Sequence, residues 1–257
     1  MCLLGEAAAH VVVGEGEGDA GGGVGGGYVE SLAEHERCIG PVLWAPDAPL
    51  PDWWNTLPAN RPTVFLSAGS SGNGSALMRA ASALREAGMT VMAATAGRIR
   101  TRDVPAGVYA TEFIPGLKAM DRADLLVCNG GSGLVYQALA LGKPVLGLPS
   151  NFDQHLVMSA VERQGAGRLL RTRQADPETV RKQALRLLTE PAYATAARRL
   201  GKRIAQTDPA SALERCFEEL PARNNPAGVP QKGRVSPTPA PIPAPLHGRL
   251  ATDLAPH

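Results

Sequence analysis

The sequence contains few residues of the kinds that mark disulfide-rich, nucleic-acid-binding or membrane-spanning proteins. Its four cysteines stand far apart, with no Cys-x-x-Cys pair and no cluster of histidines. That spacing argues against a disulfide framework and a metal site, and it fits a reducing compartment. The formal net charge is only +2, so no strongly basic surface points to nucleic acid. The opening residues MCLLGEAAAHVVVG lack the basic region of a signal peptide and are too short to span a membrane. We therefore expect a cytoplasmic protein with no integral membrane segment.

Composition divides the chain into three segments. Residues 1–38 include a glycine-rich stretch without apolar periodicity, which predicts a disordered or remnant segment. From Pro221 onward proline alternates with small residues, so residues 221–257 are expected to form an extended, disordered tail. The organised domain is expected over residues 39–220, and an apolar content of 44% is sufficient for a substantial core.

Within residues 39–220, apolar runs alternate with helical patterns. Strands are expected at residues 63–68, 89–95, 108–113, 124–128 and 144–149. The helical pattern after SGNGS ends at Gly88, and the one at residues 134–142 ends at Gly142, both typical helix-capping positions. Helices dominate from about Asp153 to Leu220. Because several strands are apolar throughout, the pattern predicts an α/β domain with a doubly wound parallel sheet.

Two glycine-rich segments follow strands of this sheet, SAGSSGNGS (67–75) and NGGSG (129–133). Ligands of such sheets bind beyond the carboxyl ends of the strands, and a glycine loop that opens a helix lets backbone N–H groups approach phosphate oxygens. Neither segment fits a Walker A loop, a GxGxxG motif or a GxSxG elbow. Each loop alone is also compatible with a tight strand-to-helix turn, but two loops on one edge favour an anion site.

Residues 128–154 carry a resemblance to a known family. They read CNGGSGLVYQALALGKPVLGLPSNFDQ, which resembles the donor-binding signature of family 1, UGT-like glycosyltransferases with the GT-B fold. The bacterial pattern is H-G-G-x-G-T-x-x-E-A-L-x-x-G-x-P, followed by an Asp-Gln pair. Further family-like fragments occur in order at residues 39–46, 51–72, 113–116 and 165–167. The resemblance implies a single Rossmann-like GT-B C-terminal domain, which binds a nucleotide-sugar donor.

The resemblance also implies a role for each site residue. The diphosphate would lie against Gly69, Ser70, Ser71, Asn129, Gly130, Gly131, Ser132 and Gly133. The base and ribose would contact Phe113, Ile114 and Gln137, and the sugar would hydrogen-bond to Asp153 and Gln154. Each role has a structural alternative: turn chemistry for the serines, core packing for Phe113 and a helix N-terminus for Asp153. The resemblance implies no bound cofactor and no metal, with a UDP- or dTDP-sugar as co-substrate.

Four positions depart from the family pattern. Asn129 replaces the usual histidine, Leu134 a threonine or serine, Gln137 a glutamate that holds the ribose, and Gly116 the glutamine of W-x-P-Q. Gln137 can keep a contact but lacks the charge that strengthens a hydrogen bond to a hydroxyl. These departures leave the fold prediction intact and leave the identity of the donor open.

The half that binds the acceptor alcohol in such enzymes has no counterpart here. That half normally supplies a histidine base, and His10 lies outside any strand–helix framework that would hold one, so the catalytic residue is unknown. The leading hypothesis is the donor-binding half of a glycosyltransferase, completed by a separate acceptor-binding subunit, or a truncated reading frame. The alternatives are a non-catalytic nucleotide-binding or regulatory domain and a nucleotide-sugar epimerase.

Overall fold

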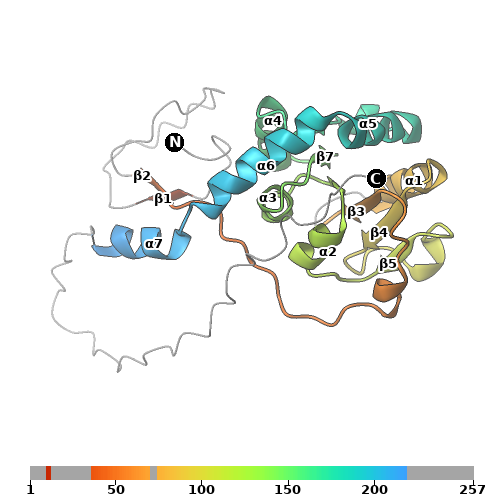
Figure 1. Cartoon of the computed structure of the whole chain (residues 1–257), viewed down its shortest axis with the longest axis horizontal. Coiled ribbons are helices and arrows are strands. Elements are labelled where there is room, and N and C mark those ends of the chain that lie inside the picture. Colours follow the sequence, from red (N-terminus) through yellow and green to blue (C-terminus); the bar gives the residue numbers. More distant parts are fainter. Residues whose placement is uncertain (1–9, 13–35, 70–73, 219–257) are drawn as a thin grey trace, which may run out of the picture. The chain divides into compact units, whose positions relative to one another are not determined.

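The computed structural model describes residues 10–12, 36–69 and 74–218 (Figure 1). The strands are β1 (His10–Val12), β2 (Glu36–Cys38), β3 (Thr63–Ser67), β4 (Thr90–Ala94), β5 (Tyr109–Thr111), β6 (Leu125–Cys128), β7 (Val145–Gly147) and β8 (Gly167–Leu169). The α-helices are α1 (Gly74–Glu86), α2 (Gly116–Arg122), α3 (Ser132–Ala140), α4 (Phe152–Arg163), α5 (Pro177–Thr189), α6 (Pro191–Ala205) and α7 (Pro209–Glu218). Short 3₁₀ helices occur at Asp52–Thr56, Thr101–Asp103 and Thr172–Gln174.

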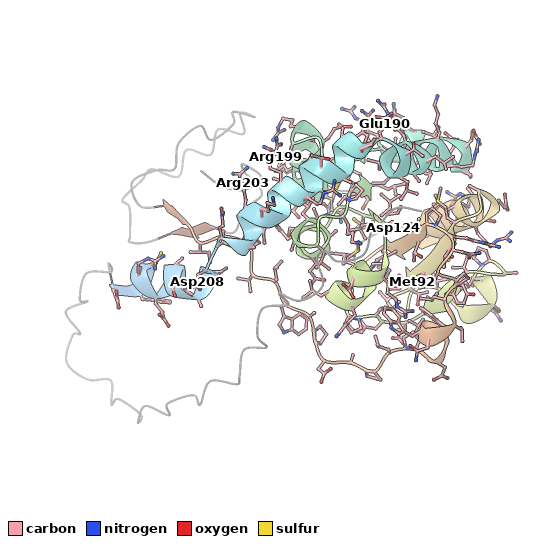
Figure 2. All side chains as sticks on the ribbon, in the orientation of Figure 1. Met92, Asp124, Glu190, Arg199, Arg203 and Asp208 are labelled. Atoms are coloured by element: carbon pink, nitrogen blue, oxygen red, sulfur yellow. The ribbon has the colours of Figure 1, made fainter. Side chains whose placement is uncertain are left out.

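The central sheet has six parallel strands in the order β5-β4-β3-β6-β7-β8. The strand order reverses between β3 and β6, which pair in parallel with Ser67 opposite Cys128. The Asp124 carboxylate closes the other end of this pair by accepting a hydrogen bond from the Thr63 N–H at 2.9 Å (Figure 2). This arrangement confirms the doubly wound sheet, and it places both glycine-rich turns at the reversal, where α/β sheets bind ligands.

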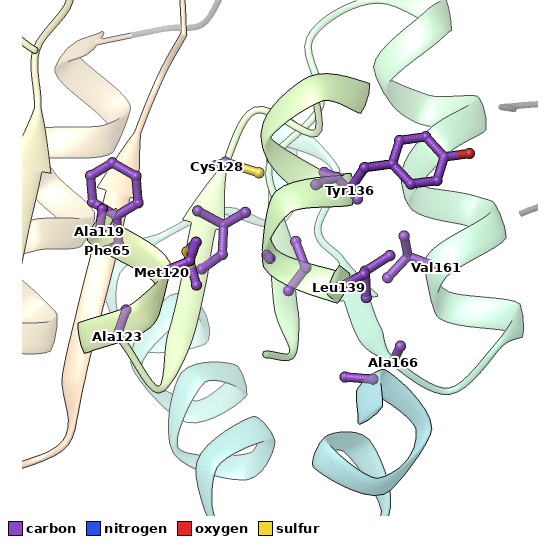
Figure 3. Packing of buried hydrophobic residues seen from close by; sticks show 14 of the residues in the cluster. Phe65, Ala119, Met120, Ala123, Cys128, Tyr136, Leu139, Val161 and Ala166 are labelled. Atoms are coloured by element: carbon purple, nitrogen blue, oxygen red, sulfur yellow. The ribbon is translucent and has the colours of Figure 1, made fainter. Parts of the chain in front are cut away.

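Alternate residues of the strands point to two separate cores, one on each face of the sheet. On one face Val64, Leu66, Val91 and Val127 pack against α1 and α5. On the other face Phe65, Met92, Leu126 and Cys128 pack against α2, α3, α4 and α6, and part of this core is drawn in Figure 3. Because both faces are covered, the strands are apolar throughout, as the sequence indicated.

Two helices end at the glycines that the sequence predicted as caps, Gly88 and Gly142. The Gly88 N–H donates to Arg85 O and the Met89 N–H to Leu84 O, and Gly88 has φ +84°. This pair of bonds and the left-handed glycine make a Schellman cap. Gly142 and Lys143 bond to Leu139 O and Ala138 O in the same way, with φ +68° at the glycine. Both predicted caps are confirmed.

Four strands and helices were not expected from the sequence. Strand β8 was missed because it has only three residues and begins at Gly167, a residue type that is depleted in strands. The glycine is needed there because a Cβ would lie 2.2 Å from the carbonyl oxygen of Val145 on the neighbouring strand. Helix α2 was missed as well. In addition, β1 and β2 pair antiparallel inside residues 1–38, where disorder was expected; the glycine-rich stretch between them lies outside the described residues.

At each edge of the sheet, one outward backbone group is bonded to a side chain. At the β5 edge, the Trp53 indole N–H donates to the outward-facing carbonyl oxygen of Ala110 at 3.3 Å. The rings of Trp53 and Tyr109 pack in a tilted arrangement with their centres 5.6 Å apart, and the Arg122 guanidinium lies 4.9 Å from the ring centre of Trp54. At the β8 edge, the outward-facing N–H of Leu169 donates to a Glu162 carboxylate oxygen at 3.3 Å.

Gly201 brings α6 close to the end of α3. A Cβ at this position would lie 2.7 Å from Leu139 O and 2.9 Å from Ala140 O. At an exposed helix position, alanine in place of glycine raises the free energy of unfolding by about 1 kcal/mol. Steric overlap with backbone atoms lowers it by about 1–3 kcal/mol. We expect Gly201→Ala to lower the free energy of unfolding in a urea titration. The same change at Gly133, where no described neighbour lies near a Cβ, should raise the free energy of unfolding. An equal increase in both variants would contradict the packing argument.

Candidate functional site

A cleft of about 420 Å³ lies at the carboxyl end of the sheet. The ends of β3 and β4 form its floor. The residues after β5 and the first turns of α3 form its sides, and residues 42–46, which precede the sheet, line it as well. The lining residues are Val42, Trp44, Ala45, Pro46, Phe65, Ser67, Gly69, Ala94, Ala96, Glu112, Phe113, Ile114, Gly116, Gly133, Leu134 and Gln137. Its volume is within the range of small-molecule sites.

Five of the predicted site residues line this cleft, although they come from three separate parts of the chain. They are Gly69, Phe113, Ile114, Gly133 and Gln137. Ile114 is buried, whereas Phe113 is 48% exposed, so Phe113 is not a core residue. Ser70 and Ser71 lie outside the described residues.

The turn after β6 is built around Gly130. This residue has φ +87°, and a Cβ would meet Met158 Cγ at 2.6 Å and the Gln154 carbonyl oxygen at 3.1 Å. The Gly130 N–H donates to the Cys128 Sγ at 3.2 Å. Gly130 therefore lets α4 lie directly against the turn, and its predicted contact with the diphosphate stays a prediction.

Asn129 joins the two glycine-rich turns. Its Oδ1 accepts a hydrogen bond from the Gly131 N–H at 3.3 Å, and its amide lies 3.4 Å from where a Cβ of Gly69 would be. A neutral amide in place of the family's histidine thus still lies between the two turns. Its predicted contact with a phosphate stays a prediction.

Helix α3 starts beside the cleft and has room in front of it. The first helical bond runs from Val135 N to Gly131 O at 3.2 Å, so the N–H groups of Ser132, Gly133 and Leu134 have no acceptor within the helix. Among the described residues, no neighbouring atom lies within 4 Å of a Cβ placed on Gly133. An anion that approaches here would meet these N–H groups and the positive end of the helix dipole.

The predicted Asp153–Gln154 pair lies at the start of α4, outside the lining of the cleft. Asn151 caps the helix, and its Oδ1 accepts from Gln154 N at 3.0 Å. Gln154 is 2% exposed, and its Oε1 accepts from the N–H and the hydroxyl of Ser150 at 2.9 and 3.1 Å. Asp153 is exposed. The amide oxygen therefore holds the turn, the carboxylate is accessible, and the sugar contacts of both residues remain predictions.

Gln137 makes a contact that the sequence did not indicate. Its Nε2 donates to the Trp44 carbonyl oxygen at 2.6 Å, across 93 positions of the chain. The side chain is 8% exposed, and its buried Oε1 has no hydrogen-bond partner among the described residues. Trp44 and Glu112 are lining residues that sequence reasoning did not assign. The signal for Trp44 was its place in the family-like fragment at residues 39–46; Glu112 directly precedes Phe113.

Burial raises the pKa of the Cys128 thiol from 9.0 to about 12, opposed only by the bond from Gly130 N–H. As the pH rises, the unfolded chain loses this proton at a lower pH than the folded chain does. The free energy of unfolding is therefore unaffected by this thiol below pH 9 and falls as the pH rises from 9 toward 12. The loss at pH 10 is about 1.4 kcal/mol. Urea titrations at pH 8 and pH 10 should show this loss in the wild type, and a smaller one in Cys128→Ala. Equal losses in the two proteins would contradict it.

The sheet order, the cleft at the reversal and the turns beside it define the class: a Rossmann-like domain of the kind that forms the C-terminal half of GT-B glycosyltransferases. The chain belongs to the family of the erythromycin biosynthesis protein CIII-like C-terminal domain, which matches residues 76–220. The family resemblance predicted from residues 128–154 is thereby confirmed.

Curated relatives and solved structures agree with this placement. A PGL/p-HBAD biosynthesis glycosyltransferase of Mycobacterium tuberculosis is 45% identical over 172 residues, which cover 67% of this chain and 40% of the relative. The 4'-demethylrebeccamycin synthase of Lentzea aerocolonigenes is 32% identical and is covered to 42%. The spinosyn rhamnosyltransferase SpnG complexed with thymidine diphosphate has a TM-score of 0.60 and 27% identity, over 69% of this chain and 50% of SpnG.

The chain thus spans less than half the length of the curated relatives that it matches. Within the described part of the chain, no helix combines the length and apolar character needed to cross a bilayer.

Proposed function

We propose that this chain binds the nucleotide of a sugar donor and serves as the donor half of a glycosyltransferase. The observation that carries the proposal is the cleft at the reversal of the strand order. There Gly69, Gly133, Phe113, Ile114 and Gln137 come together from distant parts of the chain. A partly exposed aromatic ring suits a base, and the open start of α3 suits a diphosphate.

The chemistry of this site is leaving-group stabilisation. In glycosyl transfer a bond forms between the acceptor oxygen and C1 of the sugar, and the bond from C1 to the diphosphate oxygen breaks. The nucleoside diphosphate leaves with the electron pair, and the acceptor proton passes to a base of the acceptor half. The N–H groups at the start of α3 would stabilise the charge that develops on the diphosphate. We propose no catalytic base within the described residues.

We propose a UDP- or dTDP-sugar as the donor, with a hexosyl group to be transferred. Two observations support the choice: SpnG, the structural relative at 27% identity, carries thymidine diphosphate in its complex, and a 45%-identical relative of Mycobacterium bovis is a PGL/p-HBAD biosynthesis rhamnosyltransferase. A rhamnosyl donor is therefore the first to test. The acceptor would bind to a partner half. Another solved complex of SpnG contains an aglycone.

The proposal is tested by calorimetric titration of the purified chain with UDP, thymidine diphosphate and GDP. We expect micromolar binding of UDP or thymidine diphosphate and weaker binding of GDP, whose larger base must fit the same cleft. No heat with any of the three nucleotides, from a chain that unfolds cooperatively, would overturn the proposal.

A second candidate is a nucleotide-binding domain without catalysis. The observation that favours it is the engaged amide of Gln137, which bonds to Trp44 where the family has a glutamate for the ribose. The two candidates separate in a chimera that joins the N-terminal part of the 45%-identical Mycobacterium tuberculosis relative to this chain. Transfer of sugar to the relative's acceptor by the chimera supports an active donor half. Nucleotide binding without transfer supports the second candidate.

A further inference from the structure

Residues 42–46, which we call the strap, cover the cleft. Val42, Trp44, Ala45 and Pro46 all line it, and the Trp44 side chain is 70% exposed. The strap begins after Gly40, whose φ is +88° and which packs closely against Thr207 after α6. Its middle is held by the bond from Gln137 Nε2 to Trp44 O. The strap is therefore fixed at its base and at its centre.

The bond that holds the strap requires a hydrogen-bond donor at position 137, which the Gln137 amide supplies. An ionised carboxylate only accepts hydrogen bonds, so a glutamate, the family's residue here, would repel the Trp44 carbonyl oxygen instead of binding it. The amide is also accommodated by Gly116, because a Cβ at that position would lie too close to Gln137 Oε1 to be tolerated. The departures at positions 116 and 137 thus form one packing unit: the missing side chain at 116 makes room for the amide that binds the strap.

We infer that Gln137 is a positioning residue that holds the strap as a wall of the nucleoside subsite, and that the Trp44 indole contacts the bound ligand. The inference rests on the proposed function. Trp44 and Phe113 line the same cleft, and both rings are partly exposed, so each has surface that a planar base can cover. A cleft of about 420 Å³ persists with the strap in place, so the strap does not block the site. The ligand class is a nucleotide with a flat base.

The first arm of the test needs no ligand. The chain has three tryptophans, so protein labelled with fluorotryptophan gives three fluorine resonances, and Trp44→Phe identifies the one from Trp44. Gln137→Glu and Gln137→Met both remove the donor to Trp44 O, one with a charge and one without. We expect both to shift the Trp44 resonance and to leave those of Trp53 and Trp54, which pack at the β5 edge, in place. Those two resonances also report that the variants are folded. An unmoved Trp44 resonance would overturn the positioning role.

The second arm adds UDP or thymidine diphosphate. Nucleotide should shift the Trp44 resonance of the wild type, and Trp44→Ala should raise the Kd by about threefold to tenfold, the range for loss of one aromatic contact. Gln137→Met should raise the Kd to a similar extent, because it releases the same wall. Leu50→Ala, an exposed apolar position outside the lining of the cleft, is the matched control and should bind as the wild type does.

The outcomes separate the two proposals. Suppose that the wild type binds nucleotide without a shift of the Trp44 resonance, and that Trp44→Ala binds equally well. That result would show that the strap is not part of the nucleoside subsite, while the proposed function would stand. If the wild type binds no nucleotide, the proposed function and the ligand contact of Trp44 both fail. The ligand-free arm then decides whether Gln137 positions the strap.

Discussion

Replacement of Gly133 by leucine is expected to lower nucleotide affinity by roughly a hundredfold or more and to leave the fold intact. Among the described residues, no neighbouring atom lies within 4 Å of a Cβ on Gly133, so the first carbon of the new side chain meets no steric barrier. Leucine also favours a helix over glycine by about 0.8–1 kcal/mol, which should keep stability equal or raise it. The side chain would project into the lining of the cleft at the start of α3, where the proposed diphosphate lies.

Calorimetric titration with UDP and thymidine diphosphate, beside a urea unfolding curve, measures both parts of this result. Ala192→Leu, at an exposed position of α6, is the matched control, because it places the same side chain on a helix that does not line the cleft. It should bind nucleotide as the wild type does. Wild-type affinity in Gly133→Leu would place the ligand somewhere other than the start of α3.

Replacement of Gly130 by alanine is expected to have the largest effect on stability, a loss of about 2–5 kcal/mol. The residue has φ +87°, and a left-handed conformation costs a residue with a Cβ about 1–2 kcal/mol. The added carbon would also lie 2.6 Å from the buried Met158 side chain and 3.1 Å from the Gln154 carbonyl oxygen. Such overpacking costs about 1–3 kcal/mol more.

The neighbouring glycine provides the control. Gly131 has φ −62°, and a Cβ there would meet only Asn129 Oδ1, at 3.6 Å. Gly131→Ala should therefore unfold within about 0.5 kcal/mol of the wild type, the usual range for a change that touches no packed group. Equal destabilisation by the two variants in urea would show that the turn is strained as a whole, and that Gly130 has no special part in it.

The layout of the sheet could be predicted from the sequence because its signals are local. A fully apolar run marks a strand covered on both faces, and a glycine at a helix end marks a cap, as at Gly88 and Gly142. The proximity of the turns after β3 and β6 followed from the doubly wound fold. Strand β8 escaped because Gly167 is needed for close approach to Val145, and a lone glycine gives the same signal as a turn.

The contacts that shape the cleft could not be predicted in the same way. The bond between Gln137 and Trp44 joins residues 93 positions apart, and neither residue type alone indicates the other. From the sequence, Gln137 and Gly116 were two separate losses from a family pattern. In the structure they occupy one space. Gln154 was assigned to the sugar by resemblance, yet its Oε1 is bonded to Ser150, which only the geometry of the turn reveals.

The side-chain bonds at the edges of the sheet have a consequence for how this domain meets other proteins. An edge strand with free backbone groups is a template on which another chain can add a strand. Here the Trp53 indole N–H donates a hydrogen bond to the outward carbonyl oxygen of Ala110, and the Glu162 carboxylate accepts one from the outward N–H of Leu169. Each edge strand thus has one outward backbone group already bonded to a side chain, which disfavours growth of the sheet by β-augmentation at that position. We therefore expect a companion polypeptide to associate through side chains rather than through a shared ladder of hydrogen bonds, and to detach without breaking the sheet.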